Sequence, residues 1–328
     1  MTSTTWRLID AGTSAWDQAI AGFDLDPYCD PEMMAAGGQA RGWRPVLLDL
    51  RGRGWRAVHA LFLIGLEGGQ WLARTPEYGG PWLDSEADVT SVCATVRSVT
   101  DRALVDKGVV SQVLVLSPWV PHRDEVAATW GCRPTRTICL AALDQLEVTY
   151  TSLNKGRRAD IARARRDMRV EWRPFGVADV TETSRRYGDA MDRLAAAPRW
   201  RLDHVYFEAL AQHLPGKVFL ACAHGRDGGA FGLFLVRGRY AAYVLAGRHG
   251  AGAGGSSAVL WEAQRQLAAS GVLELLLGGG NTDDPDDPLL RFKRSLANRM
   301  LALHVGGICY DEAGHARAVA AGVARPLP

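Results

Sequence analysis

Lysine is scarce in this chain, although basic residues are not. Four of the 38 basic residues are lysines and the remaining 34 are arginines. With 36 acidic residues the net charge is only +2, which argues against a strongly basic nucleic-acid coat protein. Lysine carries a compact charge with a tunable pKa, so a retained lysine marks a position where arginine is a poor substitute. The four lysines are Lys107, Lys155, Lys217 and Lys293.

Long apolar runs, paired cysteines and metal-binding spacings are also missing. No run of about 18 apolar residues occurs, so we expect no membrane span. The first residues lack a basic stretch followed by an apolar one, so we expect no signal peptide and a cytoplasmic protein. The six cysteines form no CxxC pair and the eight histidines form no HExxH, which predicts reduced, buried thiols and no metal site.

Strand and helix patterns follow the same order in both halves of the 328 residues. Meander strands come first, then a helix, a strand, a helix and a strand. In the second half we expect helices at 155–169, 256–270 (N-capped by Ser256) and 288–299, and strands at 240–245, 272–277 and 301–310. The pattern predicts an α/β (α+β) chain of two related domains, residues 1–150 and 151–328. A doubly wound nucleotide fold also alternates in this way, but no GxGxxG follows the first strand of either half, and GxxxxGK[ST] does not occur.

A very basic segment opens the second half. From Lys155 to Arg173 eight basic residues face three acidic ones, which leaves a local charge of about +5. Arg158, Arg165 and Arg169 would share one face of a helix and could hold phosphates. A solvated helix with internal salt bridges explains the same composition, so both interpretations stay open.

Two glycine-rich segments follow. Residues 248–257 precede a helix and are similar to the pyrophosphate loop of acyl-CoA-dependent N-acetyltransferases, although His249 stands where Gln or Arg is expected; a flexible connection is the alternative. Further on, a buried strand meets Gly278–Gly280, so the backbone there turns tightly or lets a ligand approach. An acidic loop follows, whose charges could also complement a helix dipole, and then a helix that carries Arg291, Lys293 and Arg294.

The order of four segments resembles the Fem-type transferases. They are Asp26-Pro27-Tyr28, Tyr78-Gly79-Gly80-Pro81, the basic helix from Arg157 to Arg166, and the C-terminal signature from Gly278 to Ser295. The family has two tandem N-acetyltransferase-like (GNAT) domains and uses aminoacyl-tRNA as donor. The resemblance therefore implies an acceptor-side first domain and a donor-side second domain, with aminoacyl-tRNA as co-substrate and no other cofactor.

The resemblance also implies roles for individual residues. Lys293 would be catalytic, with its ammonium stabilising the oxyanion or the departing 3′ oxygen of the ester. The amine proton would go to a substrate group, Asp283 or Asp284. Tyr78 and Gly79 would bind the acceptor, a small-molecule or peptide amine. Donor and tRNA contacts would come from Arg157, Arg158, Arg165, Arg166, Gly278, Gly279, Gly280, Arg291 and Phe292.

The acceptor is less defined than the donor. Family members that modify the cell-wall precursor carry a Trp and a Lys on an early helix, whereas residues 33–43 contain no lysine. A peptide or a nucleoside-antibiotic intermediate is therefore an alternative acceptor to a cell-wall precursor. An enzyme of antibiotic biosynthesis is one expectation. Two other classes remain, an acyl-CoA-dependent N-acyltransferase that uses the glycine loop and a non-catalytic RNA-binding protein that uses the basic helix.

Overall fold

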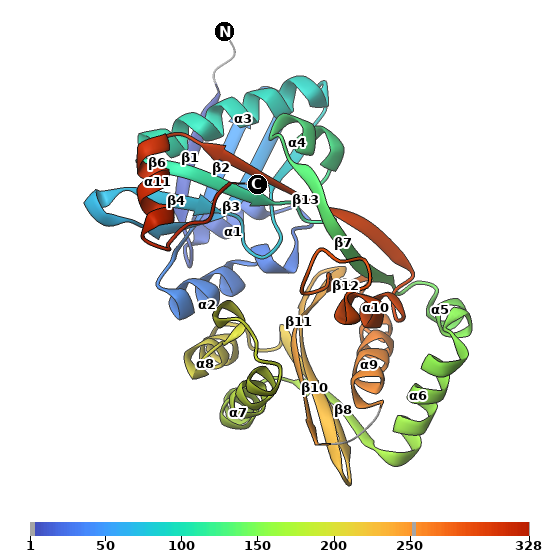
Figure 1. The fold of residues 1–328 in the computed structure, drawn as a ribbon. Helices are drawn as coiled ribbons and strands as arrows, with labels where there is room; N and C mark the ends of the chain where they lie inside the picture. The colour runs from blue at the N-terminus through green and yellow to red at the C-terminus, as the bar shows by residue number, and fades with distance from the viewer. Residues whose placement is uncertain (1–3, 251–253, 328) are drawn as a thin grey trace. The chain divides into compact units, whose positions relative to one another are not determined.

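The chain forms two compact units in the computed structural model, which describes residues 4–250 and 254–327 (Figure 1). Unit 1 runs to Thr135 and takes up the chain again from Leu303, and unit 2 is Arg136–Ala302. This division differs from the expected domains 1–150 and 151–328. The C-terminal residues belong to unit 1 because the last strand pairs antiparallel with a unit 1 strand, from Val305 opposite Val115 to Cys309 opposite Ser111.

Unit 1 contains a mixed sheet in the order β1-β2-β3-β4-β6-β13, with β5 paired to β3. Its strands are β1 (Thr5–Asp10), β2 (Arg44–Gly52), β3 (Trp55–Gly65), β4 (Trp71–Arg74), β5 (Pro81–Ser85), β6 (Val109–Val115) and β13 (Arg299–Cys309). Its helices are α1 (Ser14–Ile20), α2 (Pro31–Arg41), α3 (Val89–Asp106), α4 (Arg123–Thr129) and α11 (Glu312–Ala320), with 3-10 turns at Pro27–Cys29 and Glu67–Gly69. Apolar residues at helical spacing form the buried side of α3, which Asp88 caps through a hydrogen bond from Ser91.

Unit 2 contains a sheet in the order β7-β12-β11-β10-β9-β8. Its strands are β7 (Arg133–Ala142), β8 (Arg169–Pro174), β9 (Val218–Gly225), β10 (Gly228–Arg237), β11 (Tyr240–Gly250) and β12 (Glu274–Gly278). Its helices are α5 (Leu146–Ser152), α6 (Lys155–Asp167), α7 (Val177–Arg193), α8 (His204–His213), α9 (Gly255–Ala269) and α10 (Pro288–Arg294), with a 3-10 turn at Pro198–Trp200. Figure 1 shows α9 on one side of this sheet and α7 on the other.

Several expected element boundaries are wrong. The basic helix ends at Asp167, because Arg169 begins β8 and pairs with His224 of β9, so Arg169 cannot share a helix face with Arg158 and Arg165. The helix expected over 288–299 ends at Arg294, because Arg299 already belongs to β13. The Ser256 cap is wrong too, because the helix begins at Gly255 after Gly254, whose φ of +85° favours glycine.

Two further differences concern the ends of strands and the C-terminus. The glycine-rich segment at 248–257 begins inside β11, which extends as far as Gly250, and residues 251–253 lie outside the described residues. Helix α11 follows β13 and was not expected from the sequence; Asp311 caps it through a hydrogen bond from Gly314. Among the described helices, none combines the length and apolar character needed to cross a bilayer.

Candidate active site

The central feature of unit 2 is a fork between the parallel strands β11 and β12. The strands pair only from Tyr240 opposite Glu274 to Ala242 opposite Leu276. Beyond that point the described part of β11 pairs with β10 alone, while β12 continues beside β7 as far as Gly278. The diverging strands leave backbone groups at the edge of β11 that a bound molecule could reach.

Lys293 of α10 lies at this fork. Its ammonium donates a hydrogen bond to the carbonyl oxygen of Gly279, the first residue after β12, at 2.8 Å. The same nitrogen lies 6.0 Å from the ring centroid of Tyr243, the first residue of β11 beyond the paired segment. Burial raises the pKa of Tyr243, so its phenol is neutral at physiological pH. Lys293 therefore places a positive charge between the two strands that diverge.

The three glycines form a tight turn, one of the two roles that the sequence left open. Gly278 has a φ of +76°, a left-handed conformation that favours glycine. Gly280 lies so close to Asp287 that an added Cβ would meet its Oδ1 at 2.6 Å. The turn is therefore fixed both by its own backbone conformation and by the carboxylate beside it.

That carboxylate, buried Asp287, joins the glycine turn to α10. Its Oδ1 accepts hydrogen bonds from the backbone N–H groups of Leu289 and Leu290, both at 2.9 Å, and so caps the helix. Its Oδ2 accepts from the backbone of Asn281 and Thr282, both at 3.2 Å, and from the Thr282 hydroxyl at 3.1 Å. Burial opposes ionisation, but these hydrogen bonds outweigh it and lower the pKa of Asp287.

Arg157 of α6 holds the other end of α10. Its Nε donates to Ser295 Oγ at 2.9 Å, and its Nη1 donates to Ser257 Oγ in the first turn of α9 at 2.6 Å. The guanidinium also lies 5.0 Å from the ring centroid of Phe292, the residue before Lys293. Arg157 thus joins three helices around Lys293, and its side chain is only 19% exposed.

The other arginines expected to contact the donor are placed differently. Arg158 donates to the carbonyl oxygens of Thr151, at 2.7 Å, and Leu153, and so holds the junction between α5 and α6. Arg166 is exposed and pairs with Asp167 at 2.8 Å. Arg165 and Arg291 are exposed, and neither side chain makes a hydrogen bond or ion pair within the described part of the chain.

The two acidic-loop residues expected as proton acceptors lie at the surface. Asp283 and Asp284 are both exposed, and Asp284 Oδ1 accepts a hydrogen bond from the backbone of Asp286 at 2.8 Å. Cys139 carries a nucleophilic group beside the fork. It lies opposite Gly278 in the pairing of β7 with β12, and its side chain is buried. Burial raises the pKa of Cys139 to about 11, although Lys293 and Arg294 act in the opposite direction. Its thiol is therefore protonated at neutral pH and a poor nucleophile.

In unit 1 the structure brings two of the sequence motifs together. The rings of Tyr28 and Tyr78 are 5.8 Å apart, and Cys29 Sγ lies 3.7 Å from the Tyr78 carbonyl oxygen. Gly79 donates from its backbone to Val115 at 2.9 Å. Buried Asp26 accepts from the backbone of Tyr28 at 2.8 Å and from Ser117 Oγ at 2.6 Å.

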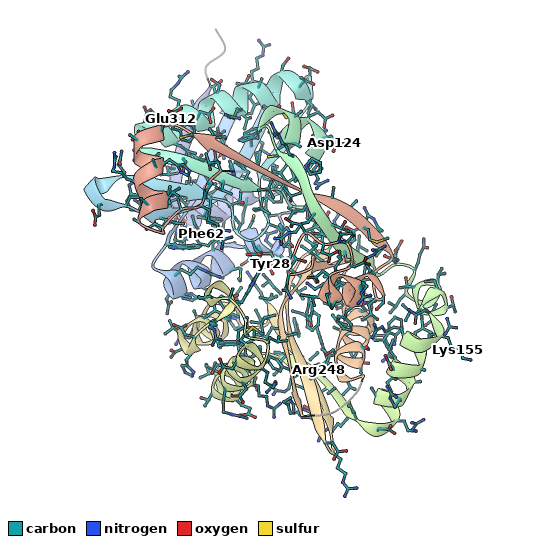
Figure 2. All side chains as sticks on the ribbon, viewed as in Figure 1. Tyr28, Phe62, Asp124, Lys155, Arg248 and Glu312 are labelled. Carbon is teal, nitrogen blue, oxygen red and sulfur yellow. The ribbon has the colours of Figure 1, made fainter. Side chains whose placement is uncertain are left out.

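The label of Tyr28 marks the Asp26-Pro27-Tyr28 segment in Figure 2, which also labels Lys155 at the start of α6 and Arg248 near the end of β11. Sequence reasoning missed the roles of Tyr243 and Asp287. Nothing local distinguishes Tyr243, but Asp287-Pro288 at the start of a helix is a recognisable capping pattern. Within residues 4–250 and 254–327, no three His, Cys, Asp or Glu side chains are arranged to hold a metal ion.

Solved structures share this fold over nearly the whole chain. FemX matches with a TM-score of 0.71 at 10% identity, over 95% of this chain and 99% of FemX. A conserved protein of unknown function from Bacteroides thetaiotaomicron VPI-5482 matches with a TM-score of 0.60 at 13% identity, over 93% of this chain and 99% of its own. L-PGS from Bacillus licheniformis matches with a TM-score of 0.56 at 12% identity, over 90% and 92%.

No family model and no curated protein matches the chain. The structural likenesses confirm the expected α/β class and the Fem-type fold. At these identities they show the fold alone, so activity has to be argued from the residues of the site.

Proposed function

We propose that the chain is an aminoacyltransferase that takes an amino acid from aminoacyl-tRNA and forms an amide bond on the amine of a small acceptor. The observation that carries this proposal is the position of Lys293, whose ammonium lies at the fork of β11 and β12 in a chain with the fold of FemX. The acceptor would be a small peptide, a nucleoside-antibiotic intermediate or a cell-wall precursor.

The chemistry needs orientation and charge stabilisation more than activation, because the donor ester is already reactive. The acceptor nitrogen attacks the ester carbonyl carbon and forms the C–N bond, and the C–O bond to the tRNA 3′ oxygen then breaks. The proton lost from the amine ends on that oxygen, which restores the ribose hydroxyl. Lys293 would stabilise the negative charge that develops on the carbonyl oxygen or on the departing 3′ oxygen.

The surroundings of Lys293 support direct transfer. A covalent thioester on Cys139 would need a thiolate, and the raised pKa of this buried thiol opposes its formation. Asp287 and Arg157 hold the two ends of the helix that carries Lys293, so the ammonium stays in place as charge develops. Preorganised charge of this kind costs no reorganisation during the reaction.

Donor and acceptor would be held by the residues expected from the sequence. Exposed Arg165, Arg166 and Arg291 are suited to phosphates of the tRNA, and such contacts weaken with salt and carry no sequence information. Tyr78 and Gly79 would line the acceptor site in unit 1. The described part of α2 offers no lysine to an acceptor phosphate, which favours an acceptor without a nucleotide.

The packing of α9 counts against the acyl-CoA alternative. A pyrophosphate would need the N-terminal turn of α9, but α6 covers that turn. A Cβ at Gly254 would lie 2.9 Å from the Asp160 carbonyl oxygen, and one at Gly255 would lie 3.6 Å from Met168 Sδ. Ser257 in the same turn already accepts from Arg157.

Donor use can be tested by mass spectrometry. The chain is incubated with a mixture of charged tRNAs, or with acetyl-CoA, together with candidate amines, and the acceptor is examined for a mass increase of one aminoacyl group. The proposal predicts an amide product from charged tRNA and none from acetyl-CoA. Acetylated product in the absence of any tRNA-dependent product would overturn it.

A further inference from the structure

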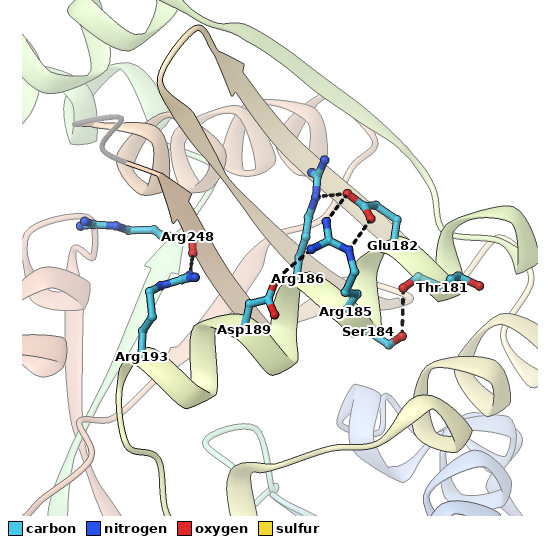
Figure 3. A network of polar contacts seen from close by, with 8 residues as sticks. All are labelled: Thr181, Glu182, Ser184, Arg185, Arg186, Asp189, Arg193 and Arg248. Atoms are coloured by element: carbon cyan, nitrogen blue, oxygen red, sulfur yellow. Dashed lines mark hydrogen bonds and ion pairs between the residues drawn. The ribbon is translucent and has the colours of Figure 1, made fainter.

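Helix α7 shows how arginines of unit 2 are neutralised within the protein (Figure 3). Arg185 pairs with Glu182 and with Asp189, both at 2.9 Å, and Arg186 pairs with Glu182 at 2.6 Å. Each of these carboxylates lies one turn away on the same helix. Arginines held in this way have little charge left for a ligand, so a partly buried arginine without a counter-charge stands apart from them.

Arg136 of β7 is such an arginine, and it lies beside the glycine turn. Its Cδ is 3.8 Å from the position that a Cβ added to Gly279 would take. Within residues 4–250 and 254–327 its guanidinium forms neither a hydrogen bond nor an ion pair. The residue is partly buried, but its side-chain nitrogens remain accessible to solvent. Because a charge removed from water needs a partner, this guanidinium is suited to a bound anion.

Arg136 and Lys293 lie on opposite faces of the sheet at this turn. Side chains alternate between the two faces along β7, and Cys139 belongs to the apolar core that contains residues of α9 and α10. Arg136 is on the other face with Ile138, whose Cγ2 is 3.7 Å from the same added Cβ. The carbonyl oxygen of Gly279, by contrast, accepts from Lys293 on α10. Gly279 therefore lies between two cationic side chains.

The cations proposed to hold the donor are on the face of Lys293. Arg165 and Arg166 are on α6, which packs against α9, and Arg291 is on α10 itself. Phosphates of the donor tRNA would therefore collect on that face. Arg136 is separate from this group, so its charge is placed for the second substrate, whose amine has to reach the same ester.

We infer that Arg136 is an acceptor-binding residue, which holds an oxyanion of the acceptor, a carboxylate or a phosphate, close to the attacking amine. A planar guanidinium binds either group through two parallel hydrogen bonds. The acceptor class is then a small amine that carries its own negative charge. This inference rests on the proposed function and assigns binding to Arg136, whereas Lys293 stabilises the charge that develops during transfer.

The test uses two matched pairs of small amines as probes. Glycylglycine and its amide differ in the carboxylate, and O-phosphoethanolamine and ethanolamine differ in the phosphate. Each probe is titrated into the chain labelled with ¹⁵N-arginine, and the Nε–Hε signal of Arg136 is followed after its assignment by Arg136→Gln. Ligand-observed NMR gives the dissociation constant for each variant. Arg53→Gln is the matched control, because it removes an exposed arginine without a partner in the described chain.

We expect one of the anionic probes to shift the Arg136 signal to saturation, and its neutral counterpart to leave the signal in place. Loss of a hydrogen bond between charged groups should weaken binding of that probe to Arg136→Gln by about 10- to 100-fold, with no change for Arg53→Gln. The pair that responds identifies the oxyanion as carboxylate or phosphate.

An Arg136 signal that neither anionic probe moves would overturn the inference, as would equal shifts from an anionic probe and its neutral counterpart. The signal is measured in the unchanged chain, so the result does not depend on the folding of Arg136→Gln. No charged tRNA is present, so failure of this test leaves the proposed transfer reaction to the mass-spectrometric experiment.

Discussion

The ammonium of Lys293 donates to the carbonyl oxygen of Gly279 at 2.8 Å and so joins α10 to the end of β12. The two residues are 14 positions apart, and the acidic loop lies between them. Because Gly279 belongs to the glycine turn, the position of the ammonium depends on the conformation of that turn. The glycines and the lysine of the C-terminal signature therefore act as one structural unit.

Asp287→Ala tests whether that unit depends on its buried carboxylate. The change removes the cap of α10 and leaves the N–H groups of Asn281 and Thr282 without their acceptor. We expect the free energy of unfolding to fall by about 2–3 kcal/mol and transfer to fall with it. Chemical denaturation measures the first effect.

The neighbouring Asp286 provides the control, since its side chain is exposed. Asp286→Ala has the same change in charge, and we expect it to unfold at the midpoint of the unchanged chain. Equal midpoints for the two variants would contradict the structural role of Asp287.

Arg157 and Arg165 lie on one helix but have different surroundings. Arg157→Ala removes two hydrogen bonds to serines and the contact with Phe292, so the free energy of unfolding should fall by about 1–3 kcal/mol. Arg165→Ala should leave the unfolding midpoint unchanged and instead reduce the salt slope of tRNA binding by about 0.7–0.9. A stable Arg157→Ala variant with normal transfer would show that this arginine does not position α10.

His59 predicts a pH dependence of stability. It is fully buried in β3, neither ring nitrogen has a partner within the described chain, and burial lowers its pKa to about 3. In the unfolded chain His59 is protonated below about pH 6.5, whereas in the folded chain it stays neutral. The free energy of unfolding therefore falls as the pH drops below that value. The slope should be about 1.4 kcal/mol per pH unit between pH 6 and pH 4.

Replacement of His59 by methionine isolates this contribution. Other titrating groups affect both proteins alike. The free energy of unfolding of the His59→Met variant should therefore fall less steeply on acidification, and the difference in slope should correspond to the binding of one proton. Parallel pH profiles for the two proteins would show that His59 is protonated in the folded state.

Much of unit 2 could be predicted from its sequence, because its signals are local. Ile161 and Ala164, three residues apart on α6, are both buried. Gly278 has a left-handed conformation, which agrees with the tight turn that was one expectation for the three glycines. Fold class and the Fem-type resemblance followed from such patterns and were confirmed by the likeness to FemX.

What could not be predicted depends on contacts distant in the sequence. Residues 303–328 belong to unit 1 because β13 pairs with β6. No local sequence pattern predicts this pairing. The hydrogen bonds of Arg157 to Ser257 and Ser295 likewise join residues that are 100 or more positions apart. Composition could therefore indicate that the helix is basic, but not which of its arginines form hydrogen bonds within the protein. The same limit applies to the ring of Tyr243 beside Lys293.

The most direct measurement is the single-turnover rate of amide formation from charged tRNA by the unchanged chain and by Lys293→Met, with Lys107→Met as control. Removal of one group that stabilises developing charge slows such a step by about 10²–10³-fold, so we expect that loss for Lys293→Met and none for Lys107→Met. The unfolding midpoint of each variant shows whether its fold is intact. A folded Lys293→Met variant that transfers at the rate of the unchanged chain would contradict the central role given to this lysine.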